Sequence, residues 1–276
     1  MQERLRGAGE AGEYMYIYRC EDTLESIFTA IYKVYEDHHH RDEVLLALED
    51  EPRLFSTVIP VAADPGRSAK VICTLIARFG EENYKDLCLA LAAPDPDKAQ
   101  AVYGTVANGI RMNSSRGHLF DALSNPEVCR AFKLSRAAGR ENCHLRGFTR
   151  FEELKNGILY SSIEPKNHLL PFLMPHFSDR FPQENFILHD VGRGIFGVHP
   201  VRQHSLTGEA GLTGDWYLVK GDEFLAECLE KSDSEEKYQM LFKCFCSSIA
   251  IKERHNIDLQ RNMLPIHFRE FMTEFH

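Results

Sequence analysis

The segment from residue 163 to residue 182 carries the densest set of side chains that could do chemistry. It is IEPKNHLLPFLMPHFSDRFP, with two histidines, two carboxylates, an arginine and four prolines around an apolar run. Histidines titrate near neutral pH and carboxylates exchange protons, so this mixture fits an acid–base or metal site. The apolar run also fits a helical crossover that covers a sheet. Both interpretations stay open from the residues alone.

Histidines and acids in the C-terminal half supply the candidates for catalysis. The candidate catalytic residues are His144, Glu164, His168, His176, Arg180 and Asp190. No HExxH, GxSxG, P-loop or GxGxxG motif accompanies them, so their spacing fixes no catalytic geometry. The favoured alternative is that these histidines lie in the core or on the surface and form no catalytic site.

A basic stripe lies on the helix that the sequence predicts after Asn125. Four of its basic residues recur at intervals of 3, 3 and 4, which places them within about one third of the helix circumference. Guanidinium groups bind phosphates in bidentate fashion, so the stripe predicts contact with DNA. The predicted DNA-binding residues are Arg130, Lys133, Arg136, Arg140, Arg146 and Arg150. A solvated face, or ion pairs with the acidic N-terminal lobe, is the alternative.

Charge divides the chain into an acidic front and a basic middle. The formal net charge is −9, which argues against a general nucleic-acid binder. Residues 1–60 hold six basic and thirteen acidic side chains, whereas residues 111–150 hold eight basic and three acidic ones. We therefore expect the acidic front to face a protein partner and the basic middle to meet DNA or that front.

Composition indicates a globular protein of the cytoplasm. Of the 276 residues, 43% are hydrophobic and 26% charged, and no apolar run approaches the roughly 20 residues that span a bilayer. The N-terminus has no hydrophobic signal core. The eight cysteines form no CxxC pair, and the adjacent His38, His39 and His40 cannot all reach one ion. We expect no membrane, no metal and no cofactor.

Periodicity predicts an α+β fold. Residues 1–13 are expected to be a disordered tail, and residues 14–120 a helix-rich lobe with a small β component. Residues 121–276 are expected to form an α+β domain, a small antiparallel sheet covered by helices. Strands are predicted at 14–20, 56–64, 147–154, 157–164, 186–191 and 194–200. Helices are predicted after Thr23, at 67–79, 82–93 and 95–113, from Asn125 to about Asn142, from His168, at 234–256, and from Pro265.

Four stretches, taken together and in order, resemble a known bacterial family. They are HLRGFTRFEEL (144–154), the segment 163–182, FILHD (186–190) and IAIKERHNIDLQRNMLPIHFREFMTEF (249–275). The family consists of DNA metabolism proteins encoded beside a radical SAM protein of DNA repair. A related C-terminal domain of unknown function occurs fused to uracil-DNA glycosylase-like proteins. The resemblance implies a role in DNA repair or modification, with a radical SAM enzyme as partner, and it transfers no catalytic residue.

Three functional hypotheses follow. The first is an accessory protein in DNA repair whose basic helix contacts DNA phosphates. The second is an enzyme that acts on damaged or modified DNA, and the third is a protein-interaction module that never contacts DNA. The chain lacks the CxxxCxxC cluster motif of radical SAM enzymes, so we do not expect it to be the radical enzyme itself.

Overall fold

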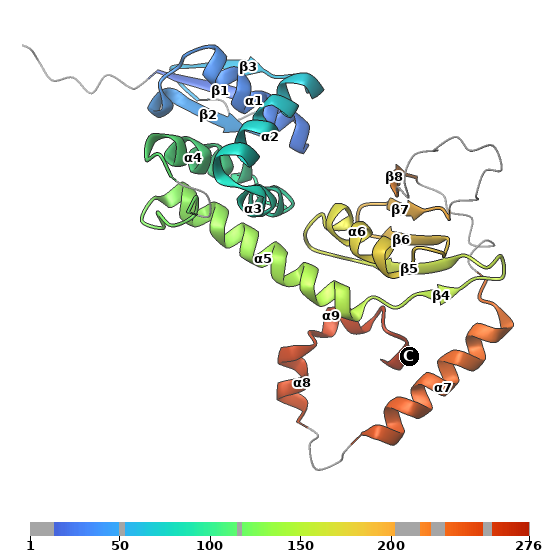
Figure 1. Cartoon of the computed structure of the whole chain (residues 1–276). Helices are drawn as coiled ribbons and strands as arrows, with labels where there is room; N and C mark the ends of the chain where they lie inside the picture. The colour runs from blue at the N-terminus through green and yellow to red at the C-terminus, as the bar shows by residue number, and fades with distance from the viewer. Residues whose placement is uncertain are drawn as a thin grey trace, which may run out of the picture. The chain divides into compact units, whose positions relative to one another are not determined.

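The computed structural model describes residues 14–49, 53–114, 118–201, 216–221, 230–250 and 256–275. These residues form an α+β fold with two small sheets, as the periodicity predicts (Figure 1). The chain divides into two compact units, Met1–Ala138 and Gly139–His276, within the long helix α5 (Pro126–Phe148). The boundary expected after residue 120 stays a prediction.

The first unit contains a three-stranded parallel sheet with the order β2-β1-β3. Its strands are β1 (Met15–Arg19), β2 (Val44–Ala47) and β3 (Ser56–Pro60). The predictions of β1 and β3 are confirmed, whereas β2 was not predicted. Strand β2 is the four-residue apolar run VLLA, and a run this short shows no alternation that would distinguish a strand from a helix.

Four helices pack with this sheet around one hydrophobic core. They are α1 (Leu24–Glu36), α2 (Pro65–Phe79), α3 (Glu81–Leu91) and α4 (Lys98–Arg111). The hydroxyl of Thr23 accepts the N–H of Ser26, and the carboxylate of Asp64 accepts the N–H of Arg67. These caps satisfy backbone donors that a helix start leaves open, and the four predicted helices are confirmed.

The histidine run follows α1 and has a structural role at His39. Its ring stacks on Tyr16, with centroids 3.7 Å apart, and its Nδ1 lies 2.7 Å from the hydroxyl of Tyr18. That hydroxyl donates to Asp37 at 2.8 Å. The 3-10 helix η1 (Arg41–Glu43) then leads into β2.

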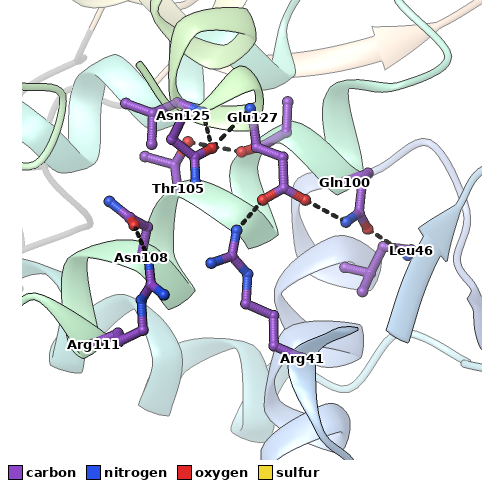
Figure 2. A network of polar contacts seen from close by, with 10 residues as sticks. Arg41, Leu46, Gln100, Thr105, Asn108, Arg111, Asn125 and Glu127 are labelled. Carbon is purple, nitrogen blue, oxygen red and sulfur yellow. Dashed lines mark hydrogen bonds and ion pairs between the residues drawn. The ribbon is translucent and has the colours of Figure 1, made fainter. Parts of the chain in front are cut away.

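A polar network joins the start of α5 to the rest of the first unit (Figure 2). Glu127 accepts hydrogen bonds from Arg41 and from Gln100, the latter at 2.6 Å. The side-chain oxygen of Gln100 in turn accepts the N–H of Leu46 in β2 at 2.9 Å. Gly104 leaves the space for this carboxylate, because a Cβ at that position would overlap Glu127.

The second unit contains a five-stranded sheet with the order β4-β5-β6-β7-β8. Its strands are β4 (Glu152–Glu153), β5 (Leu159–Ile163), β6 (Phe186–Asp190), β7 (Ile195–His199) and β8 (Tyr217–Lys220). Three pairings are antiparallel, as expected, and β5 pairs with β6 in parallel. The expected strand at 147–154 is mostly wrong, because α5 continues to Phe148 and β4 holds two residues.

Helix α6 (Leu170–Arg180) makes the crossover between β5 and β6, so the segment 163–182 does cover a sheet. Its inner side chains, among them Leu173 and Met174, are fully buried. Gly197 on β7 admits this contact, because a Cβ there would overlap the sulfur of Met174. Larger side chains at Gly197 would therefore push α6 off the sheet.

Two side chains clamp the strand-to-helix connection before α6. Glu141 accepts the N–H groups of Lys166 and Asn167, at 2.7 and 2.9 Å, and the Asn167 side chain at 2.5 Å. Arg193 donates to the carbonyls of Pro165 and Lys166, at 2.8 and 2.6 Å. Asn167 was expected to cap the helix, but its side chain binds Glu141 instead.

The C-terminal region is helical. Its elements are α7 (Asp233–Ile249), α8 (Ile257–Met263), α9 (Ile266–Arg269) and the 3-10 helix η4 (Thr273–Phe275). The first turn of α7 is fixed to β4, where the carboxylate of Glu235 accepts the N–H of Glu153 at 3.1 Å. The helix predicted at 234–256 is confirmed only as far as Ile249, and the one predicted from Pro265 through Phe275 is shorter, because α9 ends at Arg269. Helix α8 was not predicted.

Candidate functional site: an arginine-lined pocket

A pocket of about 540 Å³ in the second unit brings together three arginines and a group of phenylalanine rings. The arginines come from separate places in the sequence, two near the end of α5 and one at the end of α6. The side chains that matter for its chemistry are Arg146, Arg150, Arg180, Phe151, Phe177 and Phe181. A volume of this size lies within the range of roughly 300–1,000 Å³ that small-molecule pockets occupy.

The unexpected length of α5 positions the first arginine. The helix was predicted to end near Asn142, and its last six residues carry Arg146 to the pocket. His144 and Phe148 on the same stretch pack against Phe268, with ring centroids 5.6 and 5.5 Å away. Tertiary aromatic packing therefore accompanies a helix extension that local propensity alone did not indicate.

Arg150 is held by the protein. Its guanidinium forms a bidentate pair with Glu274, with distances of 3.3 and 2.8 Å. It also donates to the carbonyl of Gly147 at 2.8 Å. With its donors used in this way, Arg150 fixes the pocket wall and is a poor candidate for direct ligand contact.

Arg146 and Arg180 are the two cations open to a ligand. Neither guanidinium forms an ion pair with the part of the chain that the structure describes. The Nε of Arg146 is buried and has no hydrogen-bond partner among the described residues. The guanidinium of Arg180 lies 5.6 Å from the ring centre of Phe181 and is exposed. An anion in the pocket could accept hydrogen bonds from both guanidinium groups.

His176 on α6 reports the positive potential of this region. Its pKa is lowered from the ordinary value first by burial, and then by the charges of Arg146 and Arg180. Asp179 opposes this change only partly. The two positive charges that contribute to this lowering would also favour an anionic ligand nearby.

The aromatic wall is centred on Phe151. Its ring meets those of Phe177, Phe181 and Phe186 edge-on, with centroids 5.1, 5.4 and 5.5 Å apart. Phe177 is almost fully buried, whereas Phe151 and Phe181 keep part of their surface exposed. Partly exposed rings beside guanidinium groups can hold a flat, apolar group next to a bound anion.

A smaller polar pocket of about 170 Å³ lies at β5 and α7. Tyr160 is part of its lining, and its hydroxyl lies 2.8 Å from Nδ1 of His189. Burial raises the pKa of Tyr160 and lowers that of His189. This pair was not among the predicted site residues. Finding it would have required the register of β5 and β6, in which Ser162 lies opposite His189.

The six predicted catalytic residues are not gathered into one cavity within the described ranges. His144 packs on Phe148 and Phe268, and Glu164 is exposed on the strand-to-helix connection. His168 is half-buried just before α6, and His176 lies on α6. Arg180 alone of the six lines the arginine-lined pocket.

Asp190 has a structural role at the end of β6. It is fully buried. Its carboxylate accepts hydrogen bonds from Nη1 of Arg193 at 3.0 Å and from the backbone N–H of Arg193 at 3.2 Å. Burial raises the pKa of Asp190, and the charge and hydrogen bonds of Arg193 oppose that change. Asp190 thereby orients the arginine that clamps the connection before α6.

The residues of the predicted basic stripe lie along the surface of α5. Arg130 forms an ion pair with Asp95 of the acid-rich α3–α4 connection, which matches the alternative of pairing within the chain. Lys133, Arg136 and Arg140 are exposed. At about 100° per residue, Arg146 is rotated by about 120° from Arg140, so the pocket and the stripe use different sides of the helix.

The described ranges contain neither a cluster of metal ligands nor a helix that could span a membrane. No group of three or more histidine, cysteine or acidic side chains there could hold a metal ion. No helix in those ranges is both long enough and apolar enough to cross a membrane.

The fold and the pocket together define an α+β protein with an arginine-lined aromatic cavity. The chain belongs to the family DUF4130, a domain of unknown function, whose model matches residues 96–274. The search of curated proteins and the search of solved structures both returned no match. The family match covers the pocket completely and begins at the end of the α3–α4 connection of the first unit.

Proposed function

We propose that this chain is an accessory protein of DNA metabolism that binds single-stranded DNA in the arginine-lined pocket. The observation that carries the proposal is the meeting of Arg146 and Arg180, neither ion-paired within the described chain, with partly exposed phenylalanine rings. Single-strand binders combine cations that follow the phosphates with rings on which bases stack. The pocket offers both kinds of contact within one cavity.

The arginines of the pocket have different roles in this proposal. Arg146, which is half-buried in the pocket wall, and exposed Arg180 both donate from their guanidinium groups to the phosphate. Phe151 and Phe181 provide the surfaces for the adjoining base. Arg150 holds the wall in place through Glu274 and does not contact DNA. The stripe residues Lys133, Arg136 and Arg140 supply attraction at longer range, in line with the first hypothesis drawn from the sequence.

A radical SAM enzyme is the proposed protein partner. The support is the resemblance of the four stretches between residues 144 and 275 to the DNA metabolism family. Co-purification of the two proteins at both low and high salt would support a specific complex. Failure to co-purify under either condition would count against this part of the proposal without touching the DNA-binding part.

The test of DNA binding is fluorescence anisotropy with labelled single-stranded and double-stranded oligonucleotides over a salt series. The variant pair Arg146→Gln with Arg180→Gln should weaken single-strand binding at least ten-fold. It should also reduce the salt slope by about 0.7, since both arginines bind one phosphate and each single-strand phosphate contact contributes about 0.7. Arg136→Gln with Arg140→Gln is the matched control, with the same charge change on a different side of α5. Equal losses in both pairs would contradict the pocket assignment.

A further inference from the structure

A second pocket, of about 590 Å³, lies in the first unit between α1, α2 and α4. The partly exposed side chains of Tyr32, Val71 and Ile110 line it, together with the buried Leu75 and Phe79 of the hydrophobic core. Helices α1 and α2 precede the family match, so most of this lining lies outside that match. We call this cavity the α1–α2 pocket.

The α1–α2 pocket has the size and the lining of a small-molecule site. Its volume lies within the roughly 300–1,000 Å³ of such sites, which are mostly apolar and carry a few polar groups. A concave apolar wall takes up the apolar body of a ligand, because removing apolar surface from water is favourable. The chemical class of the rest of the ligand depends on the charged groups of the lining.

Arg78 on α2 forms the wall next to the end of α4. Its Nη2 donates to the carbonyl oxygen of Ile110 at 3.2 Å and to Oδ1 of Asn113 at 3.1 Å. Burial raises the pKa of Tyr35 on α1, and the charges of Arg41 and Arg78 oppose that change. Arg78 is therefore held by the protein, and its positive charge reaches the opposite wall of the pocket.

Lys70 on α2 is the cation that remains for a ligand. Its Nζ lies 5.6 Å from the ring centre of Tyr32 and forms no ion pair with the described part of the chain. Glu36, the acidic residue of the lining, is instead paired with Arg67 at 3.1 Å. An ammonium group beside apolar and aromatic walls attracts an anion more strongly than one surrounded by water, because the walls reduce screening.

The charges of the lining select among ligand classes. Lys70 and Arg78 are positive, Glu36 is neutralised by Arg67, and the remaining histidine, His38, is either neutral or positive. A cationic ligand would be repelled, and a neutral apolar ligand would leave the ammonium group without a partner. A ligand with an apolar body and an acidic group uses both the wall and the cation.

We propose that the α1–α2 pocket binds a small amphipathic anion, a molecule with an apolar body and one acidic head group. The body lies on Val71 and Ile110, and the carboxylate, sulfonate or phosphate head accepts a hydrogen bond from Nζ of Lys70. Arg78 keeps its contacts with α4 and adds attraction at longer range. The proposal does not depend on DNA binding in the arginine-lined pocket.

Fluorescence titration with 8-anilinonaphthalene-1-sulfonate tests the role of Lys70. N-phenyl-1-naphthylamine is the matched neutral probe, because it is the same molecule without the sulfonate. Both probes are titrated into the full chain that carries Arg146→Gln and Arg180→Gln, so that the arginine-lined pocket lacks its two open cations. Lys70→Gln in this chain should raise the dissociation constant of the sulfonate about ten-fold, the effect of one lost hydrogen bond to a charged group. The affinity for the neutral probe should not change.

Lys85→Gln is the matched control variant. Lys85 is exposed on α3 and does not line the pocket, so its replacement makes the same charge change elsewhere in the first unit. This variant should bind the sulfonate as the unchanged chain does. Equal losses of sulfonate affinity in Lys70→Gln and Lys85→Gln overturn the proposal. A loss of the neutral probe as large as that of the sulfonate overturns it as well.

Methyl NMR of the full chain shows where the sulfonate probe binds. The probe should shift the methyl resonances of Val71 and Ile110, which line the pocket. These shifts should disappear in Thr74→Trp, because an indole at this exposed position of the lining would fill the pocket. Absence of binding, or binding without shifts at Val71 and Ile110, overturns the proposal.

Discussion

At the scale of single residues, the two ends of α5 use charge in different ways. Glu127 in the first turn is bound by Arg41 and Gln100, so its carboxylate serves the fold. Arg146 in the last turn has a buried Nε with no partner within the described ranges. Buried polar groups are normally satisfied, so an unsatisfied one beside a cavity is a reason to look for a ligand.

His176 gives a residue-level prediction about the pocket's field. Arg146 lowers the pKa of His176 because a nearby cation disfavours the imidazolium. Arg146→Gln should therefore raise the pKa of His176, though not fully to its ordinary value, because burial is the larger cause. Titration of the imidazole resonances by NMR measures this change. An unchanged pKa would show that Arg146 does not reach this region.

Glu141 gives a second residue-level prediction. Its carboxylate accepts two backbone N–H groups and the amide of buried Asn167. Glu141→Ala should lower the free energy of unfolding by about 2 kcal/mol, because a donor left without its partner costs roughly 1–3 kcal/mol. Chemical denaturation compares the variant with Glu164→Ala, whose side chain is exposed. A difference of less than about 0.5 kcal/mol between the two would contradict the clamp.

At the scale of elements, periodicity and capping residues predicted most helices of the first unit and the start of α5. Asn125 marks the start of α5, and its side chain accepts the N–H groups of Glu127 and Val128. The end of α5 was missed because aromatic packing around Phe148 lies far away in the sequence. The pocket depends on that end of α5. Its arginines were therefore predicted as separate site residues but not as one site. Only the fold shows that Arg146 and Arg180 share one cavity.

Gly104 gives the prediction for an element contact. A Cβ at this position would displace the carboxylate of Glu127 and disturb its bonds to Arg41 and Gln100. Gly104→Ala should therefore destabilise the first unit by about 1–3 kcal/mol, although alanine normally favours a helix. Thermal unfolding of the variant and of Ala107→Gly separates the two effects. Stabilisation by Gly104→Ala would contradict the packing of α5 on α4.

At the scale of the whole molecule, the boundaries of the family match differ from those of the two compact units. The match begins at residue 96, yet Gln100 and Glu127 of the matched part bind Leu46 and Arg41, which precede it. The α4 residues Val102 and Val106 also belong to the core that includes α1 and α2. Helix α4 and the start of α5 therefore complete a unit whose other half lies outside the family match.

A truncated chain tests this dependence. Removal of residues 1–95 should expose the apolar side of α4, so amide hydrogens of residues 98–136 should exchange much faster than in the full chain. Exchange in β5 and β6, which belong to the second unit, should change little. Hydrogen exchange read by mass spectrometry measures both regions at once. Unchanged protection of α4 would contradict the account of the first unit.

The most direct test of the central claim is to find where single-stranded DNA touches the protein. An oligonucleotide that carries 5-iodouracil is cross-linked by light to the wild-type chain, and the attached peptides are identified by mass spectrometry. We predict cross-links at Phe151, Phe181 or Phe242, lost in the variant pair Arg146→Gln with Arg180→Gln. Cross-links confined to the stripe of α5, or unaffected by that pair, would contradict the proposal that the arginine-lined pocket binds DNA.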